Sequence, residues 1–133
     1  MKDDYYLALD AYNRYVQDDT RPPIKVVREL EASDHEHALL TAAIIRNRYQ
    51  GKFLNPEAVL AALIKAGEKI GYAQYLAGLC YANGYGTRKH RKTAARRYQK
   101  GADMAVFVNV VVASPYATCF NSSGRIRSGF NQT

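Results

Sequence analysis

The sequence predicts an all-α protein, and within that class a short α-solenoid of about three helix-turn-helix repeats. Three observations predict it. Apolar residues recur at helical spacing along most of the chain, capping residues and prolines separate these stretches, and the chain resembles itself at a shift of 35 residues. The 133 residues, 47% of them hydrophobic, are enough for one domain with a core.

The first helix pair is predicted over residues 4–32. Apolar side chains at helical spacing predict a helix from about Asp4 to Gln17. Pro22 and Pro23 then open a second helix, because proline fits the first turn of a helix but not its interior.

The second pair is predicted over residues 34–69, and two capping motifs mark where its helices begin. In the segment SDHE, the Ser33 hydroxyl can accept a hydrogen bond from the backbone of Glu36, whose carboxylate can reach back. This capping box predicts a helix over 34–49. Asn55, which a proline follows, is a second cap and predicts a helix that runs to about Lys69.

The third pair is predicted over residues 71–102, with helices over about Tyr72–Ala82 and Arg91–Ala102. We expect Asn83 and Gly84 to end the first of these helices in left-handed conformations, and Gly86 to complete the bend. A phosphate-binding loop is not favoured here, because a helix and not a strand precedes Gly84.

Residues 104–133 are predicted to form a degenerate capping half-repeat and an irregular tail. The stretch Val106–Val112 is β-branched, but a single strand has no partner in this chain, which favours a distorted helix. The alternative is a truncated or altered native end.

The self-similarity is clearest between the second and third pairs. At a shift of 35 residues, Gly51 falls on Gly86 and the cap Asn55 falls on His90. The first pair fits a shift near 33. Each pair would leave an apolar face that only a neighbouring pair can cover, which is how solenoids are stabilised.

The third pair resembles the Sel-one-like repeat (SLR), a tetratricopeptide-like helical repeat. Its signature residues here are Ala73, Gly78, Tyr81, Gly84, Gly86, Ala94 and Tyr98. Gln74, Asn83, Lys100 and Ala102 also match the family pattern, whereas Thr87, His90, Thr93, Arg97 and Gly101 depart from it. The resemblance implies a right-handed α/α superhelix over residues 1–103, closed by the C-terminal segment.

The resemblance also implies a concave groove lined by the first helix of each pair. Carried over to this chain, the groove residues are His37, Leu40, Ile44, Asn47, Arg48, Tyr72, Tyr75, Leu79 and Asn83. Such a surface could hold an extended segment or a helix of a partner. For Leu40, Ile44 and Leu79 a place in the core is the open alternative, because groove and core both select apolar residues.

Charge is distributed unevenly along the chain. Residues 1–36 contain five basic and nine acidic groups, a net charge of −4, whereas residues 37–133 contain fourteen basic and three acidic groups, a net charge of +11. The residues that we call the basic patch are Arg88, Lys89, Arg91, Lys92, Arg96, Arg97 and Lys100. The patch could bind nucleic acid or an acidic protein, or could be a solvated helix face.

Candidate catalytic residues are few, so we expect no enzyme, no cofactor and no metal site. His35 and His37 lie two apart and are expected on different faces of one helix, and His90 is isolated. Cys80 and Cys119 match no metal spacing, and Cys80 is expected to be a buried free thiol. No general acid–base pair or nucleophile motif is recognised.

The sequence thus predicts a scaffold or adaptor that binds a protein or peptide, and an acidic partner would match the charge of the basic patch. The resemblance suggests a bacterial regulatory, inhibitor or immunity-type protein. A nucleic-acid-binding module that uses Arg88–Lys100 is the alternative. No membrane partner is expected, a homodimer through the solenoid end is possible, and the absence of a signal-peptide pattern favours the cytoplasm.

Overall fold

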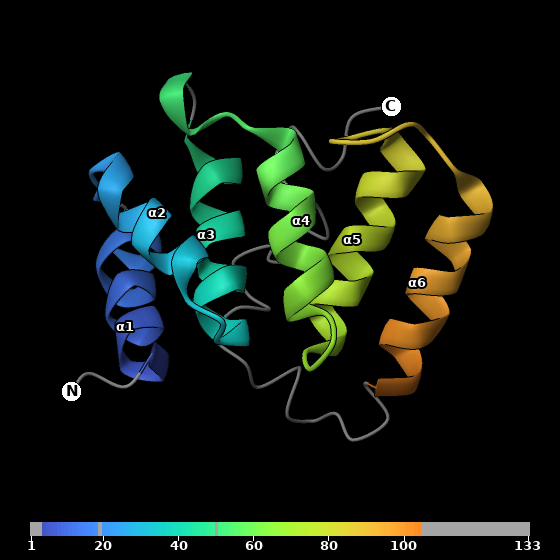
Figure 1. Cartoon of the computed structure of the whole chain (residues 1–133), viewed down its shortest axis with the longest axis horizontal. Coiled ribbons are helices and arrows are strands. Elements are labelled where there is room, and N and C mark those ends of the chain that lie inside the picture. The colour runs from blue at the N-terminus through green and yellow to red at the C-terminus, as the bar shows by residue number, and fades with distance from the viewer. Residues whose placement is uncertain (1–3, 19, 50, 105–133) are drawn as a thin grey trace.

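The computed structural model describes residues 4–18, 20–49 and 51–104, and these are helical without any strand (Figure 1). The α-helices are α1 (Asp4–Ala11), α2 (Ile24–Ala32), α3 (Glu36–Arg48), α4 (Pro56–Ala66), α5 (Gly71–Asn83) and α6 (Arg91–Met104). Short helical segments of other types are η1 (Tyr12–Gln17) and η2 (Gly51–Phe53). The all-α prediction is therefore confirmed for this part, whereas the predictions for Val106–Val112 and Cys119 lie outside the described residues.

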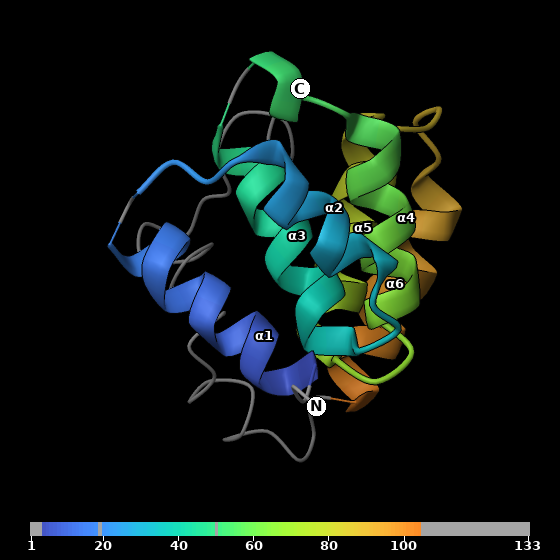
Figure 2. The same cartoon turned by 60° about the vertical axis from the view of Figure 1, so that its left-hand side comes forward.

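The helices form a row in chain order from α3 to α6, with α1 and α2 at the other end of the long axis (Figure 1). From α2 onwards, each helix packs against the next one along the chain. The N-terminal helix differs, because α1 packs mainly on α3 and contacts α2 only sparsely, an arrangement visible in Figure 2. The first pair is thus a looser hairpin than the pair α5–α6.

The core is centred on α3, whose residues 38–47 are all buried. Helices α1, α2 and α4 all pack on it. A helix enclosed in this way needs apolar or small residues around its whole circumference, which is what the sequence ALLTAAII supplies. The charged Arg46 is the exception, and its guanidinium binds both carboxylate oxygens of Glu31 and the carbonyl oxygen of Phe53.

The N-terminal helix is not the single α-helix that the periodicity predicts. After Ala11 the chain widens into the π-helical turn η1, and the Asp18 amide donates to the carbonyl oxygen of Asn13 at 3.1 Å, five residues earlier. Tyr12 and Val16 are nevertheless buried, so the predicted apolar side of this segment does face the core.

The predicted capping box at Ser33 is wrong. The Ser33 hydroxyl donates to the Asp4 carboxylate at 2.7 Å and accepts from the His35 amide at 3.0 Å, so it does not cap Glu36. His35 is the cap instead, because its Nδ1 accepts from the His37 amide, and α3 begins at Glu36. The cap at Asn55 is confirmed, since its side-chain oxygen accepts from the Ala58 amide at 3.1 Å.

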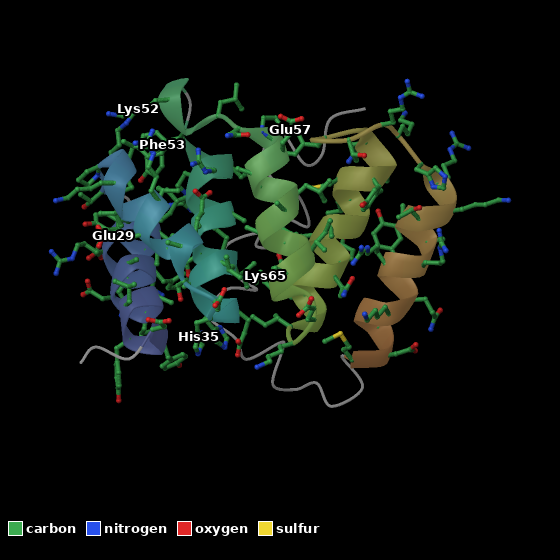
Figure 3. The ribbon with its side chains drawn as sticks, in the orientation of Figure 1. Glu29, His35, Lys52, Phe53, Glu57 and Lys65 are labelled. Carbon is green, nitrogen blue, oxygen red and sulfur yellow. The ribbon has the colours of Figure 1, made fainter. Side chains whose placement is uncertain are left out.

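Helix α4 ends earlier than the sequence predicts. It stops at Ala66, and residues 67–69 form a turn in which the Lys69 and Ile70 amides both donate to the Ala66 carbonyl oxygen. Near this end, Lys65 donates to Asp34 at 2.6 Å and so ties α4 to the segment before α3 (Figure 3). This ion pair holds the pKa of the Asp34 carboxyl below its ordinary value.

The partial burial of His37, near the start of α3, predicts that the free energy of unfolding depends on pH. Burial lowers the pKa of His37 below 6.5, nearby His35 lowers it further, and Glu36 opposes the shift. The unfolded chain therefore binds a proton at this position more readily than the fold does. We expect the free energy of unfolding to fall as the pH is lowered through about 6.5, with no further loss from His37 below its pKa in the fold.

Urea unfolding of the wild type and of His37→Gln over this pH range, followed by circular dichroism, measures the effect. The substituted protein should show a flatter dependence of stability on pH. Equal slopes for the two proteins would show that His37 does not contribute to the dependence.

Candidate functional site

The connection between α5 and α6 is a tight turn built on two glycines with left-handed backbone. Gly84 has φ 70°, as the sequence predicts, and Gly86, which was expected only to complete the bend, is left-handed too with φ 79°. Asn83 remains the last residue of α5 instead of adopting the predicted left-handed conformation. The amides of Gly84 and Tyr85 both donate to the carbonyl oxygen of Cys80, which closes the end of the helix.

The turn also packs on the start of α4. A Cβ atom on Gly86 would lie 2.4 Å from the carbonyl oxygen of Pro56, a distance that no side chain can occupy. The His90 amide donates to the Tyr81 carbonyl oxygen at 2.9 Å and brings the chain back to α5. The glycines therefore serve the packing of three helices and do not form an open loop.

Helices α5 and α6 approach each other closely because small residues lie between them. A Cβ atom on Gly78 would lie 2.7 Å from two ring atoms of Tyr98, and one on Gly101 would lie 2.9 Å from the Gly71 carbonyl oxygen. Ala94 is buried in the same contact. Tyr98 is half-buried, and this burial raises the pKa of its hydroxyl.

Gln74, which is 1% exposed, connects α4, α5 and α6. Its amide nitrogen donates to the Gly67 carbonyl oxygen at 2.8 Å, and its amide oxygen accepts from Arg97 Nη1 at 3.1 Å. The Arg97 guanidinium also lies over the Tyr81 ring, 5.8 Å from its centre. The hydrogen bond to Gln74 and the contact with the Tyr81 ring thus hold the Arg97 guanidinium in one orientation. The repeat pattern gave no reason to expect either contact.

A row of three tyrosines lies along α5 and reaches α6. The rings of Tyr72 and Tyr75 stack with centres 6.1 Å apart, and Tyr75 contacts the Tyr98 ring at 5.6 Å. Tyr75 is 44% exposed, whereas Tyr72 and Tyr98 are half-buried. Leu79 and Asn83, the other groove residues predicted on α5, are also half-buried.

The half of the groove that was predicted on α3 is not an open surface. Leu40, Ile44 and Asn47 are buried, and the interpretation of Leu40 and Ile44 as core residues is the correct one. The physical reason is the central position of α3 among its neighbours. Arg48 is used structurally, since its Nη1 donates to the Val16 carbonyl oxygen at 2.6 Å.

The two neighbouring histidines lie together, contrary to the prediction that they face apart. The rings of His35 and His37 are 5.5 Å apart, because His35 precedes the helix as its cap. Tyr5 of α1 contacts both rings, at 5.9 Å and 5.3 Å. The sequence carried no signal for this contact, which joins residues from distant parts of the chain.

The basic patch is exposed except at Arg97 and occupies the start and one side of α6. A shallow depression of about 350 Å³ is lined by Thr93, Arg96, Arg97 and Lys100. Arg96 Nη2 donates to the Thr93 hydroxyl at 3.3 Å, and His90 Nδ1 caps the helix by accepting from the Thr93 amide. Within the described residues, no carboxylate forms an ion pair with a cation of this patch.

Metal-ligating and thiol side chains are the remaining candidates for chemistry in the described residues. These residues contain no group of three His, Cys, Asp or Glu side chains that could hold a metal ion. Burial raises the pKa of Cys80 to about 12, so this thiol stays protonated at neutral pH. None of the helices in the described ranges is long and apolar enough to cross a membrane.

Two features recur at the 35-residue shift. Gly51 and Gly86 both have left-handed φ values, 69° and 79°. Asn55 and His90 both cap the helix that follows by accepting a hydrogen bond from the amide three residues on.

Comparisons with family models, with curated proteins and with solved structures found no match to this chain.

The glycine turn predicts a clear order of stability between two variants. Gly84→Ala keeps ordinary contact distances and should cost about 1 kcal/mol, the strain of a left-handed alanine. Gly86→Ala adds a clash with the backbone of Pro56 and should cost roughly 3 kcal/mol or more. Urea unfolding of both variants measures the difference, and equal losses would contradict the packing role of Gly86.

Proposed function

We propose that the protein is a non-catalytic scaffold that binds a protein or peptide partner through the tyrosine row of α5 and α6. The observation that carries this proposal is the exposure of Tyr75, 44%, between the rings of Tyr72 and Tyr98. A rigid aromatic side chain held between neighbours presents apolar contact area at a low entropic cost. Such side chains contribute most of the binding energy at protein interfaces.

The proposed architecture is a short right-handed solenoid of the Sel-one-like type. The recurrence of left-handed glycines and helix caps at the 35-residue shift supports it, as do the close contacts at Gly78 and Ala94. In that architecture the first helix of each pair lines the groove. Because α3 is buried here, the groove that we propose is confined to α5, with Leu79 and Asn83 next to the tyrosines.

The biological setting follows from the resemblance. We propose a bacterial adaptor, or an inhibitor or immunity-type protein that masks another protein, in the cytoplasm. A non-catalytic role is supported by the raised pKa of Cys80 and by the use of the three histidines in caps and packing.

Nucleic-acid binding through Arg88–Lys100 is the second candidate, because the exposed cations of α6 could contact phosphates. The placement of the tyrosines argues against it as the first choice. Tyr98 and Lys100 lie two residues apart on a helix, so they point about 160° away from each other. Base stacking on the tyrosine row and phosphate contacts by Arg96 and Lys100 would therefore fall on different sides of α6.

Selection of peptides against the full chain from a displayed library tests the scaffold function. We expect the selected peptides to lose about thirtyfold in affinity for Tyr75→Ala, the effect of removing a central aromatic contact. Tyr6→Ala, which removes a tyrosine that is 65% exposed on α1, is the matched control and should leave binding unchanged.

Circular dichroism should show the same helicity for both variants and the wild type. Equal peptide binding by Tyr75→Ala and wild type would remove the tyrosine row as the binding surface. A shift of nucleic-acid probes by the wild type at physiological salt, without any selected peptide, would favour the second candidate instead.

A further inference from the structure

We infer that the side of α6 lined by Thr93, Arg96, Arg97 and Lys100 binds the carboxylate groups of an acidic peptide segment. We call this surface the α6 cationic face. The inference rests on the proposed peptide-binding function and adds a second contact surface for an acidic segment of the same partner, on another side of α6 than the tyrosine row. The four residues follow one another at positions i, i+3, i+4 and i+7, so they lie on one side of the helix over a rise of about 10 Å.

The charges of this face lack the carboxylate partner that three other cations of the described residues have. Arg46 pairs with Glu31, Lys65 pairs with Asp34, and Arg14 pairs with Asp10. On the α6 cationic face, by contrast, the described residues supply no carboxylate. The nearest acidic residue along α6, Asp103, accepts a hydrogen bond from Gln99.

The guanidinium groups of this face are also partly fixed in place. Arg97 is held by the amide oxygen of Gln74 and by the Tyr81 ring, and Arg96 is held by the Thr93 hydroxyl. Side chains that are ordered before binding lose less entropy when a ligand arrives. The planar guanidinium matches a carboxylate with two parallel hydrogen bonds, and the nearby ammonium of Lys100 adds a point charge.

The size of the face favours a peptide over a nucleic acid. The depression of about 350 Å³ is lined by described residues of a single helix, enough for a few acidic side chains. A surface for single-stranded nucleic acid would need cations that follow the spacing of a phosphate backbone and aromatic rings beside them. The exposed ring of Tyr75 belongs to the other side of α6, where Tyr98 packs.

Fluorescence anisotropy with a labelled oligoglutamate peptide and the full chain tests the inference. The measurement is made at about 0.15 M salt, where long-range charge effects are largely screened. Arg96→Gln combined with Lys100→Gln should weaken binding about tenfold. The matched control, Lys25→Gln combined with Arg28→Gln, removes the same charge from exposed positions on α2 and should change binding by less than about twofold.

Three outcomes would overturn the inference. The first is that the wild type binds oligoglutamate no better than a neutral serine–glycine peptide. The second is that the two double variants lose affinity equally. The third is that single-stranded DNA binds more tightly and depends on the same two α6 residues. Each is distinguishable from a failure of the scaffold function. If peptides selected from the library still bind in a Tyr75-dependent way, the tyrosine row stands as a binding surface and only the α6 cationic face is removed as a second contact surface.

Discussion

The arrangement of this fold depends on the close approach of α5 and α6 at Gly78. The Tyr98 ring lies where any side chain larger than hydrogen would collide, and Gly101 makes a second such contact with the backbone of Gly71. These two contacts fix the position of α6. Arg97 can therefore donate to the amide oxygen of Gln74. Because Gln74 in turn donates to the Gly67 carbonyl oxygen at the end of α4, it joins α4 to the pair α5–α6.

Because α5 and α6 approach each other so closely, some tyrosines pack between the helices whereas Tyr75 remains at the surface. Tyr98 covers Gly78, and Tyr81 lies beneath the Arg97 guanidinium, so both serve the contact between the helices. Tyr75 lies against Tyr98 but keeps 44% of its surface exposed, which packing alone does not require. The surface that we propose for binding thus lies at the outer edge of a structural contact, and its rigidity comes from that contact.

Local signals in the sequence predicted local structure well. The glycine turn and the Asn55 cap followed from residue types whose backbone preferences are intrinsic. The prediction that Ser33 caps α3 was wrong because its hydroxyl donates to Asp4, which is far away in sequence. The spacing of residues cannot reveal such a partner. The prediction that Leu40 and Ile44 line a groove was wrong for a related reason, because apolar residues recur with the same spacing in a core and in a groove. Only the packing of α1, α2 and α4 around α3 decides between them.

The position of α6 at the end of the described row explains why its cations are exposed. Helix α3 is covered by three other helices and tolerates one buried charged residue, Arg46, because Glu31 and the Phe53 carbonyl oxygen compensate it. Helix α6 packs extensively on α5 alone among the described helices, so its remaining sides can carry charge without desolvation. Uncompensated charge persists at this position because the fold does not need to bury it. Because the positive charge of α6 stays exposed, it is available for a ligand. This is why we propose that acidic peptides bind at this end of the row.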